Sequence, residues 1–307
     1  MRVLITGATG TIGLAVVDAL RERGDEVAAL TRDPERGQRV LGDGVEVHPW
    51  ADPTSAPPPA DALAGIDGVI HLLGEPVAQR WTDAAKERIR DSRVLGTRML
   101  VTALAGMPEG AGPRVLVSQS ATGYYGPRDD TPLDEQAAAG HDFLADVVVA
   151  WEREAAAAAP RMRVAMTRTG VVLSPSGGAL AKMLPFFRLG IGGPVAGGRQ
   201  YVPWVHLDDV VAAFLYALDH EAVSGPINVT APNPVTNGEL SHALGHALSR
   251  PAVLPVPGMA VTLLYGEMAE IVTTGQRAIP AQLQEWGYSF RHPNLEPALR
   301  DVLGTSA

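Results

Sequence analysis

A glycine-rich turn near the amino terminus restricts the fold of this chain more than any other sequence feature. The motif TGATGTIG follows an apolar run, residues 3–6, that we expect to be a strand, and a stretch with helical spacing, residues 12–23, follows. Gly7 permits a tight turn, Gly10 lets a ligand approach the backbone, and Gly13 lets the helix pack close on the strand. The free N–H groups at the helix start then suit the diphosphate of a dinucleotide. The predicted cofactor contacts along this turn are Gly7, Thr9, Gly10, Thr11, Ile12 and Gly13.

The rest of the chain continues the same alternation of strands and helices. Near-continuously apolar strands separated by helices indicate a parallel sheet that is covered on both faces. Beyond Gly170, glycine and proline become dense before helices reappear, which favours a second lobe that closes over a cofactor. The sequence therefore predicts an α/β fold, a Rossmann-like doubly wound parallel sheet with a smaller C-terminal α+β substrate lobe. We expect the Rossmann domain in residues 1–170, with sheet-completing pieces from about 200–230, and the substrate lobe mainly in 171–307. The expected strands are 27–31, 45–48, 68–73, 114–118 and 163–169, and the expected helices are 83–106, 142–159, 208–220, 237–250 and 280–287.

The composition excludes several classes of partner. The 34 acidic and 25 basic side chains give a formal net charge of -9, and such a surface repels nucleic acid. The chain has no cysteine, which rules out disulfides and thiolate chemistry and favours a reducing compartment, so we expect a cytoplasmic protein. No stretch reaches the roughly 18 to 20 apolar residues that cross a bilayer, so no membrane association is expected.

The end of the second predicted strand indicates which dinucleotide is preferred. A carboxylate at this place accepts a hydrogen bond from a free ribose 2′-hydroxyl, whereas a guanidinium pairs with a 2′-phosphate. Arg32 lies there, with Thr31 as a second phosphate contact, so the sequence favours NADP(H) over NAD(H). Asp33 is the counter-evidence, and an ordinary surface arginine is the alternative interpretation of Arg32.

Further motifs make the chain resemble the short-chain dehydrogenase/reductase superfamily, extended type. Within it, the chain is similar to an atypical NAD(P)-dependent epimerase-family group with a small C-terminal domain of unknown function, whose members are described as nucleoside-diphosphate-sugar epimerases or oxidoreductases. The resemblance covers essentially the whole chain and implies cofactor contacts at Leu72, Gly74, Glu75 and Ser118. It rests on HLLGEP from His71, SQSATGYYG from Ser118, RTGVVL from Arg168, GGRQ from Gly197, WVH from Trp204, and LQEWGY from Leu283.

The resemblance also exposes a missing catalytic pair. In the superfamily, a serine polarises the carbonyl, a tyrosine transfers the proton, and a lysine four residues later activates the tyrosine. Ser120 fits the first role, but residues 143–149, where the Tyr-x-x-x-Lys pair is expected, contain neither tyrosine nor lysine. The remaining candidates for the proton donor are Tyr125 and Tyr124, while His141 is better explained as a helix-start residue. A phenol would need a cationic or hydrogen-bonding neighbour, which the sequence does not identify.

Cationic and aromatic residues outside the glycine turn are candidates for binding a small anionic or sugar-like substrate. The alternatives are a structural salt bridge and a core indole. No histidine pair has metal-site spacing, so no metal is expected. The predicted activity is an NADP(H)-dependent oxidoreductase or epimerase acting on a carbonyl or secondary alcohol, and the alternative is a cofactor-binding regulator or sensor without turnover. We expect either a monomer or a homodimer. The candidate substrate contacts are Arg80, Trp81, Arg93, Arg199 and Trp204.

Overall fold

A seven-stranded parallel sheet forms the centre of the molecule. The computed structural model describes residues 1–304 of the chain. The strand order is β11-β7-β5-β4-β1-β2-β3, and each neighbouring pair is parallel. This confirms the predicted Rossmann-like, doubly wound fold. The strands are β1 (Arg2–Thr6), β2 (Glu26–Thr31), β3 (Val45–Pro49), β4 (Gly68–His71), β5 (Val115–Ala121), β7 (Arg163–Thr169) and β11 (Gly225–Val229).

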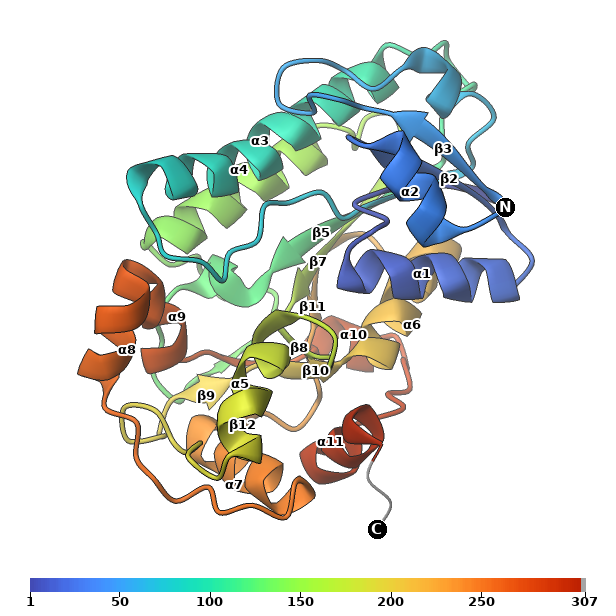
Figure 1. Cartoon of the computed structure of the whole chain (residues 1–307). Coiled ribbons are helices and arrows are strands. Elements are labelled where there is room, and N and C mark those ends of the chain that lie inside the picture. The colour runs from blue at the N-terminus through green and yellow to red at the C-terminus, as the bar shows by residue number, and fades with distance from the viewer. Residues whose placement is uncertain (305–307) are drawn as a thin grey trace.

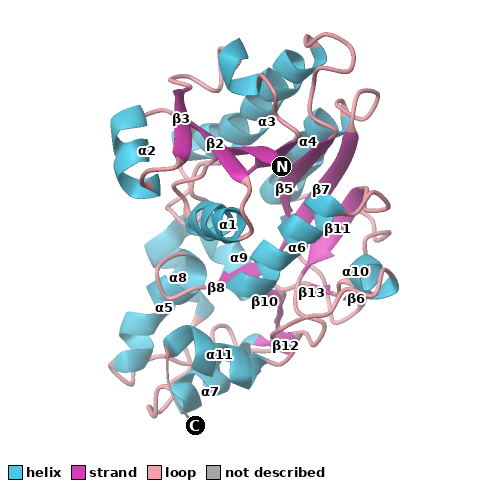
Figure 2. Cartoon of the chain, turned by 90° about the vertical axis from the view of Figure 1, so that its right-hand side faces the viewer, coloured by secondary structure: helices cyan, strands magenta, loops and turns pink. Residues whose placement is uncertain are grey.

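Helices cover both faces of this sheet, as Figures 1 and 2 show. The helices α1 (Thr11–Glu22) and α6 (Leu207–Asp219) pack together on one face, and α3 (Asp83–Ala105) and α4 (Phe143–Ala156) on the other. The central strands are almost wholly buried because apolar side chains point into both layers. A short helix, α2 (Pro34–Leu41), lies against β3.

Helices and short strand pairs build a smaller lobe below the carboxyl edge of the sheet (Figure 1). A separate core of buried apolar residues joins α5 (Gly178–Arg188), α7 (Asn237–Ala247) and α11 (Leu295–Leu303). Within residues 1–304, no helix has both the length and the apolar content to cross a membrane. The remaining elements are η1 (Ala60–Leu63), η2 (Thr122–Tyr125), η3 (Gly266–Ala269), α8 (Gly258–Tyr265), α9 (Glu270–Thr273), α10 (Ala281–Glu285), and the pairs β8 (Val171–Leu173) with β10 (Trp204–His206), β9 (Tyr201–Val202) with β12 (Val235–Thr236), and β6 (Pro132–Leu133) with β13 (Arg277–Ala278).

The strand order reverses between β1 and β4, and this reversal fixes where a ligand binds. The connection from β1 leads outward to β2, whereas β4 lies on the other side of β1. In open α/β sheets, ligands bind in the crevice outside the carboxyl ends of the strands at such a switch point. The glycine turn follows β1, so it lies at this crevice.

A buried hydrogen-bond cluster joins β1 and β4 just below the crevice. The Thr6 hydroxyl oxygen accepts from the backbone N–H groups of Leu72 and Leu73, so its own hydrogen is donated to His71 Nδ1 at 2.8 Å. Nε2 of His71 therefore carries the ring hydrogen and donates it to Thr97 Oγ1 at 2.9 Å. The ring is fully buried and neutral, and it sets the register at which β4 meets the glycine turn.

Acid should destabilise the protein through His71. Burial lowers the pKa of this ring to about 3, whereas an unfolded histidine has a pKa of about 6.5. Between these values the unfolded chain binds a proton that the folded chain does not, so the free energy of unfolding falls by up to about 1.4 kcal/mol per unit as the pH drops below about 6.5. Urea unfolding at a series of pH values measures this slope. His71→Gln should cost stability at neutral pH but give a shallower slope, and equal slopes would contradict the assignment.

Candidate functional site

The glycine turn is built so tightly that its backbone leaves no room for side chains. Gly7 has a φ of +68°, and a Cβ added there would lie 2.6 Å from the carbonyl oxygen of Leu72. A Cβ on Gly13 would lie 2.3 Å from the carbonyl oxygen of Gly7. The Gly10 N–H donates to the Gly7 carbonyl at 3.0 Å and closes the turn. These contacts explain why glycine is needed at positions 7 and 13.

The amino terminus of α1 lies at the crevice. Its N-cap is Gly10, and no side chain caps it in the part of the chain that the structure describes. The first helical residues, Thr11 and Ile12, are half-buried. An uncapped helix start with a glycine turn beside it fits an anionic group such as a diphosphate, because its N–H groups and the helix dipole favour negative charge. Residues 7–13 therefore have the geometry to hold a dinucleotide.

A segment of the smaller lobe covers this helix start from outside. Gly177, the N-cap of α5, lies against Thr11, because a Cβ on Gly177 would be 2.2 Å from Thr11 Oγ1. Like α1, α5 begins without a side-chain cap within the described residues. Two uncapped helix starts therefore meet at the crevice.

The end of β2 presents Arg32 as an exposed cation. Asp33, its acidic neighbour, is the N-cap of α2 and accepts a hydrogen bond from the Arg36 N–H at 3.0 Å. The Thr31 hydroxyl contacts the backbone of Asp33 at 3.2 Å and 3.3 Å. Asp33 thus has a structural role as the cap of α2. Its acidic side chain is therefore a weaker argument against a contact between Arg32 and a 2′-phosphate.

The loop after β4 is held from behind by helix α3. Arg93 Nη1 donates to the carbonyl oxygens of Glu75 and Ile89, both at 3.0 Å, and its guanidinium lies against Gly74. Ser92 Oγ accepts from the Glu75 N–H. Burial lowers the pKa of Arg93 to about 10. Arg93 therefore holds the predicted cofactor loop in place. No observation favours its predicted contact with a substrate.

Ser120 lies at the end of β5 within a buried polar network. Its hydroxyl donates to Glu152 Oε1 on α4 at 2.6 Å, and the side chain is almost fully buried. Arg168 on β7 clamps the same carboxylate, with Nε–Oε1 and Nη2–Oε2 distances of 2.8 Å. Because the hydroxyl hydrogen is given to Glu152, polarising a substrate carbonyl would require Ser120 to break this bond. The other predicted contact on β5, Ser118, is buried beside it.

The two neighbouring tyrosines have different environments. Tyr125 is 0% exposed, and its hydroxyl contacts Asn228 Oδ1 at 2.7 Å, the Asp134 carbonyl at 2.9 Å and Arg168 Nη1 at 3.1 Å. Burial raises the pKa of Tyr125 to about 12. Tyr125 is a structural residue, and this corrects its prediction as a proton donor. Tyr124 is half-buried, and its ring lies on the Arg168 guanidinium, 3.4 Å from ring centroid to Cζ.

The predicted substrate contacts do not converge on one place. Trp81 is buried against Phe143 and donates to the Val77 carbonyl, which agrees with the alternative interpretation as a core indole. Trp204 is 0% exposed and donates to the Asn233 carbonyl, so its prediction as a substrate contact is corrected as well.

Arg80 and Arg199 are exposed but lie in different surroundings. Arg80 reaches the Leu263 carbonyl on α8 at 3.4 Å. Arg199 lines a pocket of about 590 Å³. Only Arg199 among the five predicted substrate contacts lines this pocket, as far as the described residues show. The lining residues are Arg128, Asp129, Asp130, Gly198, Arg199, Gln200, Tyr201 and Thr236.

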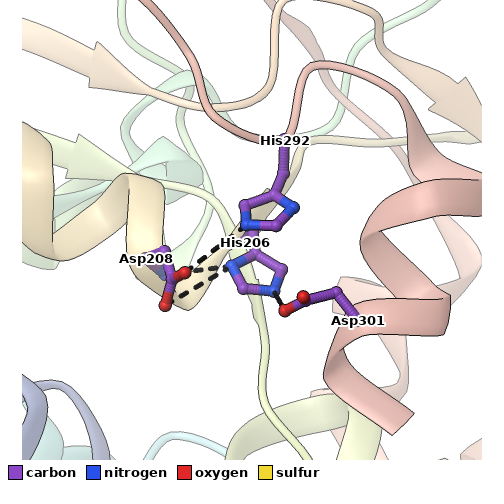
Figure 3. Close-up of side chains that lie close together, drawn as sticks. All are labelled: His206, Asp208, His292 and Asp301. Atoms are coloured by element: carbon purple, nitrogen blue, oxygen red, sulfur yellow. Dashed lines mark hydrogen bonds and ion pairs between the residues drawn. The ribbon is translucent and has the colours of Figure 1, made fainter. Parts of the chain in front are cut away.

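A cluster of two histidines and two aspartates, which sequence spacing did not indicate, joins α6 to α11 (Figure 3). His206 Nδ1 accepts from the Asp208 N–H at 3.0 Å, so Nε2 carries the ring hydrogen; Nε2 lies 3.1 Å from Asp301 Oδ2. A metal on Nε2 would need the opposite tautomer, which the helix cap disfavours. The His292 ring stacks on His206 at 3.7 Å. Burial first, and His292 second, lower the pKa of His206. We interpret the cluster as a structural contact that holds the start of α6 against α11.

The sheet with its glycine turn at the switch point defines a nucleotide-binding α/β protein of the short-chain dehydrogenase/reductase type. A model of the NAD dependent epimerase/dehydratase family matches residues 3–230, and a model of a domain of unknown function, DUF1731, matches residues 256–302. The chain belongs to the NAD dependent epimerase/dehydratase family. This confirms the resemblance drawn from the motifs and indicates a general NAD(P)-dependent enzyme.

Several relatives are similar over almost the whole chain. An epimerase family protein SDR39U1 homolog, chloroplastic, of Arabidopsis thaliana is 39% identical and covers 99% of this chain and 87% of its own. Epimerase family protein MT2273 of Mycobacterium tuberculosis is 41% identical, with 97% and 96% covered. The crystal structure of human epimerase family protein SDR39U1 with NADPH has a TM-score of 0.87 at 32% identity and covers 100% of both chains.

Gly7→Ala should disrupt the turn and weaken NADPH binding. The added methyl meets the Leu72 carbonyl at 2.6 Å in a left-handed backbone conformation, so the turn must shift. Gly24→Ala is the matched control, because Gly24 has a φ of +84° with no atom within 4 Å of an added Cβ. The control should lose about 1–2 kcal/mol through backbone strain and keep its NADPH affinity, whereas Gly7→Ala should lose more stability and most of its affinity. Urea unfolding and fluorescence titration measure both, and equal affinities in the two variants would argue against a coenzyme on this turn.

Proposed function

We propose that the chain is an NADP(H)-dependent oxidoreductase or epimerase that acts on a carbonyl or secondary alcohol of a small molecule. The observation that carries this proposal is the uncapped start of α1 beside a glycine turn that excludes side chains, at the switch point of the sheet. When bound there, the coenzyme supplies or accepts hydride. The residues proposed to hold it are Gly7, Thr9, Gly10, Thr11, Ile12, Gly13, Thr31, Arg32, Leu72, Gly74, Glu75 and Ser118.

Charge at the end of β2 supports NADP(H) over NAD(H). Arg32 is exposed, and Asp33 is engaged as the cap of α2. A guanidinium binds a phosphate through charge-assisted hydrogen bonds, whereas it offers a ribose hydroxyl no acceptor. The crystal structure of human SDR39U1 with NADPH supports the same choice.

A nucleotide sugar is the substrate class that we propose to test first. A 34% identical protein of Corynebacterium glutamicum, whose structure has a TM-score of 0.77, is described as a nucleoside-diphosphate sugar epimerase; 99% of this chain and 58% of that one are covered. The pocket offers two cations, Arg128 and Arg199, and the ring of Tyr201, which suit phosphate and a base or sugar ring, although the carboxylates of Asp129 and Asp130 also line it.

A second candidate function is an NADP(H)-binding regulator or sensor without turnover. The engagement of Ser120 and Tyr125 in buried hydrogen bonds favours it. Fluorescence titration with NADPH and NADH, followed by an NADPH-oxidation assay with simple ketones and a product analysis for epimerisation of UDP-glucose, separates the two candidates. Binding with turnover supports the enzyme, binding without turnover supports the regulator, and no binding overturns both.

Arg32→Glu should invert the coenzyme preference. Loss of charge-assisted hydrogen bonds worth about 1.5–3 kcal/mol should weaken NADPH binding by roughly 10-fold to 100-fold, while NADH binding should stay level or improve. Arg39→Glu is the charge control, because Arg39 is also exposed but lies in the last turn of α2. Fluorescence titration of all three proteins measures the affinities, and an unchanged NADPH-to-NADH ratio in Arg32→Glu would remove Arg32 from the site.

A further inference from the structure

The face of the Arg168 guanidinium is covered by the ring of Tyr124. The distance from the guanidinium carbon to the ring centroid is 3.4 Å, and Arg168 is only 3% exposed while Tyr124 is half-buried. Four of the five guanidinium N–H groups have partners in its plane: Nε and Nη2 each donate to Glu152, and Nη1 donates to the Tyr125 hydroxyl at 3.1 Å and the Glu135 carbonyl at 3.2 Å. These in-plane bonds fix the guanidinium and leave its face for Tyr124.

The contact places a fixed cation directly on the ring that would carry the negative charge once Tyr124 has given up its proton. The negative charge of a phenolate spreads into the ring, where a cation at contact distance attracts it. Burial works to lower the pKa of Arg168, but the hydrogen bonds and charge of Glu152 outweigh it and raise that pKa, so Arg168 stays charged. The Glu152 carboxylate opposes the effect of Arg168 on Tyr124; it bonds Nε and Nη2 at 2.8 Å, whereas the face of the guanidinium lies directly on the Tyr124 ring.

We propose that Tyr124 and Arg168 form the proton-transfer pair of this chain, in place of the absent Tyr-x-x-x-Lys pair, with Tyr124 as proton donor and Arg168 as its positioning residue. The inference rests on the proposed function. Tyr124 belongs to η2, which follows β5 directly, and β5 neighbours β4 at the switch point. The pair therefore lies on the same edge of the sheet as the glycine turn.

The reaction step balances with a proton from water. As hydride from NADPH forms the new C–H bond at the substrate carbon, the C=O π bond opens, and the substrate oxygen takes the proton from the Tyr124 O–H. The carbonyl is reduced, the coenzyme is oxidised, and a phenolate remains over Arg168. Since Tyr124 is half-exposed, it regains a proton from solvent. Oxidation of an alcohol runs through the same bonds in reverse.

Nitration of Tyr124 by tetranitromethane tests the pair without a substrate. This reagent attacks phenolates, so the rate at mildly alkaline pH reports how much phenolate is present. The charged and titratable groups around the contact of Tyr124 with Arg168 come from several elements: Glu152 on α4 and Glu135 after β6 bond Arg168, and the neutral Tyr125 within η2 contacts both residues. Peptide mass spectrometry gives the rate at Tyr124 and, as an internal control, at the half-buried Tyr265 on α8.

The two partners of the ion pair should shift the rate in opposite directions. Arg168→Met should slow nitration of Tyr124, and Glu152→Gln should speed it. Arg168→Lys should restore part of the rate. A merely structural pair would expose Tyr124 in both variants and speed nitration in both. An unchanged or faster rate in Arg168→Met, or a slower one in Glu152→Gln, overturns the proposal.

Two further measurements keep the test decisive. If Arg168→Met does not fold because Glu152 is left buried and unpaired, the double variant with Glu152→Gln is compared with Glu152→Gln alone, and slower nitration is again expected. With any carbonyl probe that the native protein reduces, Tyr124→Phe should lower kcat by about a hundredfold with unchanged NADPH affinity, and a native kcat overturns the proposal. If the native protein does not bind NADPH, the proposed function is refuted instead. The nitration rates still test whether Arg168 acts on Tyr124.

Discussion

The close approach of the first glycine turn to strand β4 is the constraint on which the rest of the site depends. Gly7 lies against the Leu72 carbonyl, and the Thr6 and His71 side chains hold the two strand ends in register beneath it. Because this contact is made by backbone and buried polar groups, it fixes the start of α1 relative to the sheet. The uncapped N–H groups, the crevice and the end of β2 all take their positions from it.

A second buried polar structure organises the neighbouring strand ends. Arg168 and Glu152 form a bidentate ion pair that is 3% and 9% exposed, and Ser120 and Tyr125 hydrogen-bond to it. Buried pairs of this kind cost desolvation and are compensated by complete hydrogen bonding. The network is therefore rigid, and it holds β5, β7 and α4 together at the edge where the glycine turn also lies.

Much of the sheet could be predicted from the sequence, because strands buried on both faces leave long apolar runs. All the expected strands and the long helices are present, as residues 163–169 and 83–105 illustrate. Helix α2 was missed, although Asp33 and Pro34 are a usual helix start. Helices α8 and α11 were missed as well: Leu295, Ala298 and Leu299 of α11 have helical spacing and are buried, whereas α8 buries only Val261.

The candidate site was predictable only in part, for a physical reason. Glycines at positions 7 and 13 signal a backbone constraint that is local in sequence, so the turn was found. Whether an aromatic side chain reaches the site or the core depends on distant segments, so Tyr125 was predicted as a proton donor and Trp204 as a substrate contact although both are fully buried. Arg168 was overlooked, yet a charged residue inside a buried strand is a usable signal, because it must have a buried partner.

The contact between Gly177 and Thr11 shows that the surroundings of the glycine motif include a residue from much later in the sequence. Thr11 stands in the first lobe, and Gly177 begins a helix of the second. A fragment that ended before α5 would contain every glycine of the motif and still leave its outer side bare. Grafting the amino-terminal half onto another protein would consequently transfer the glycine motif without the start of α5. The recipient protein would then need a segment of its own that packs against Thr11.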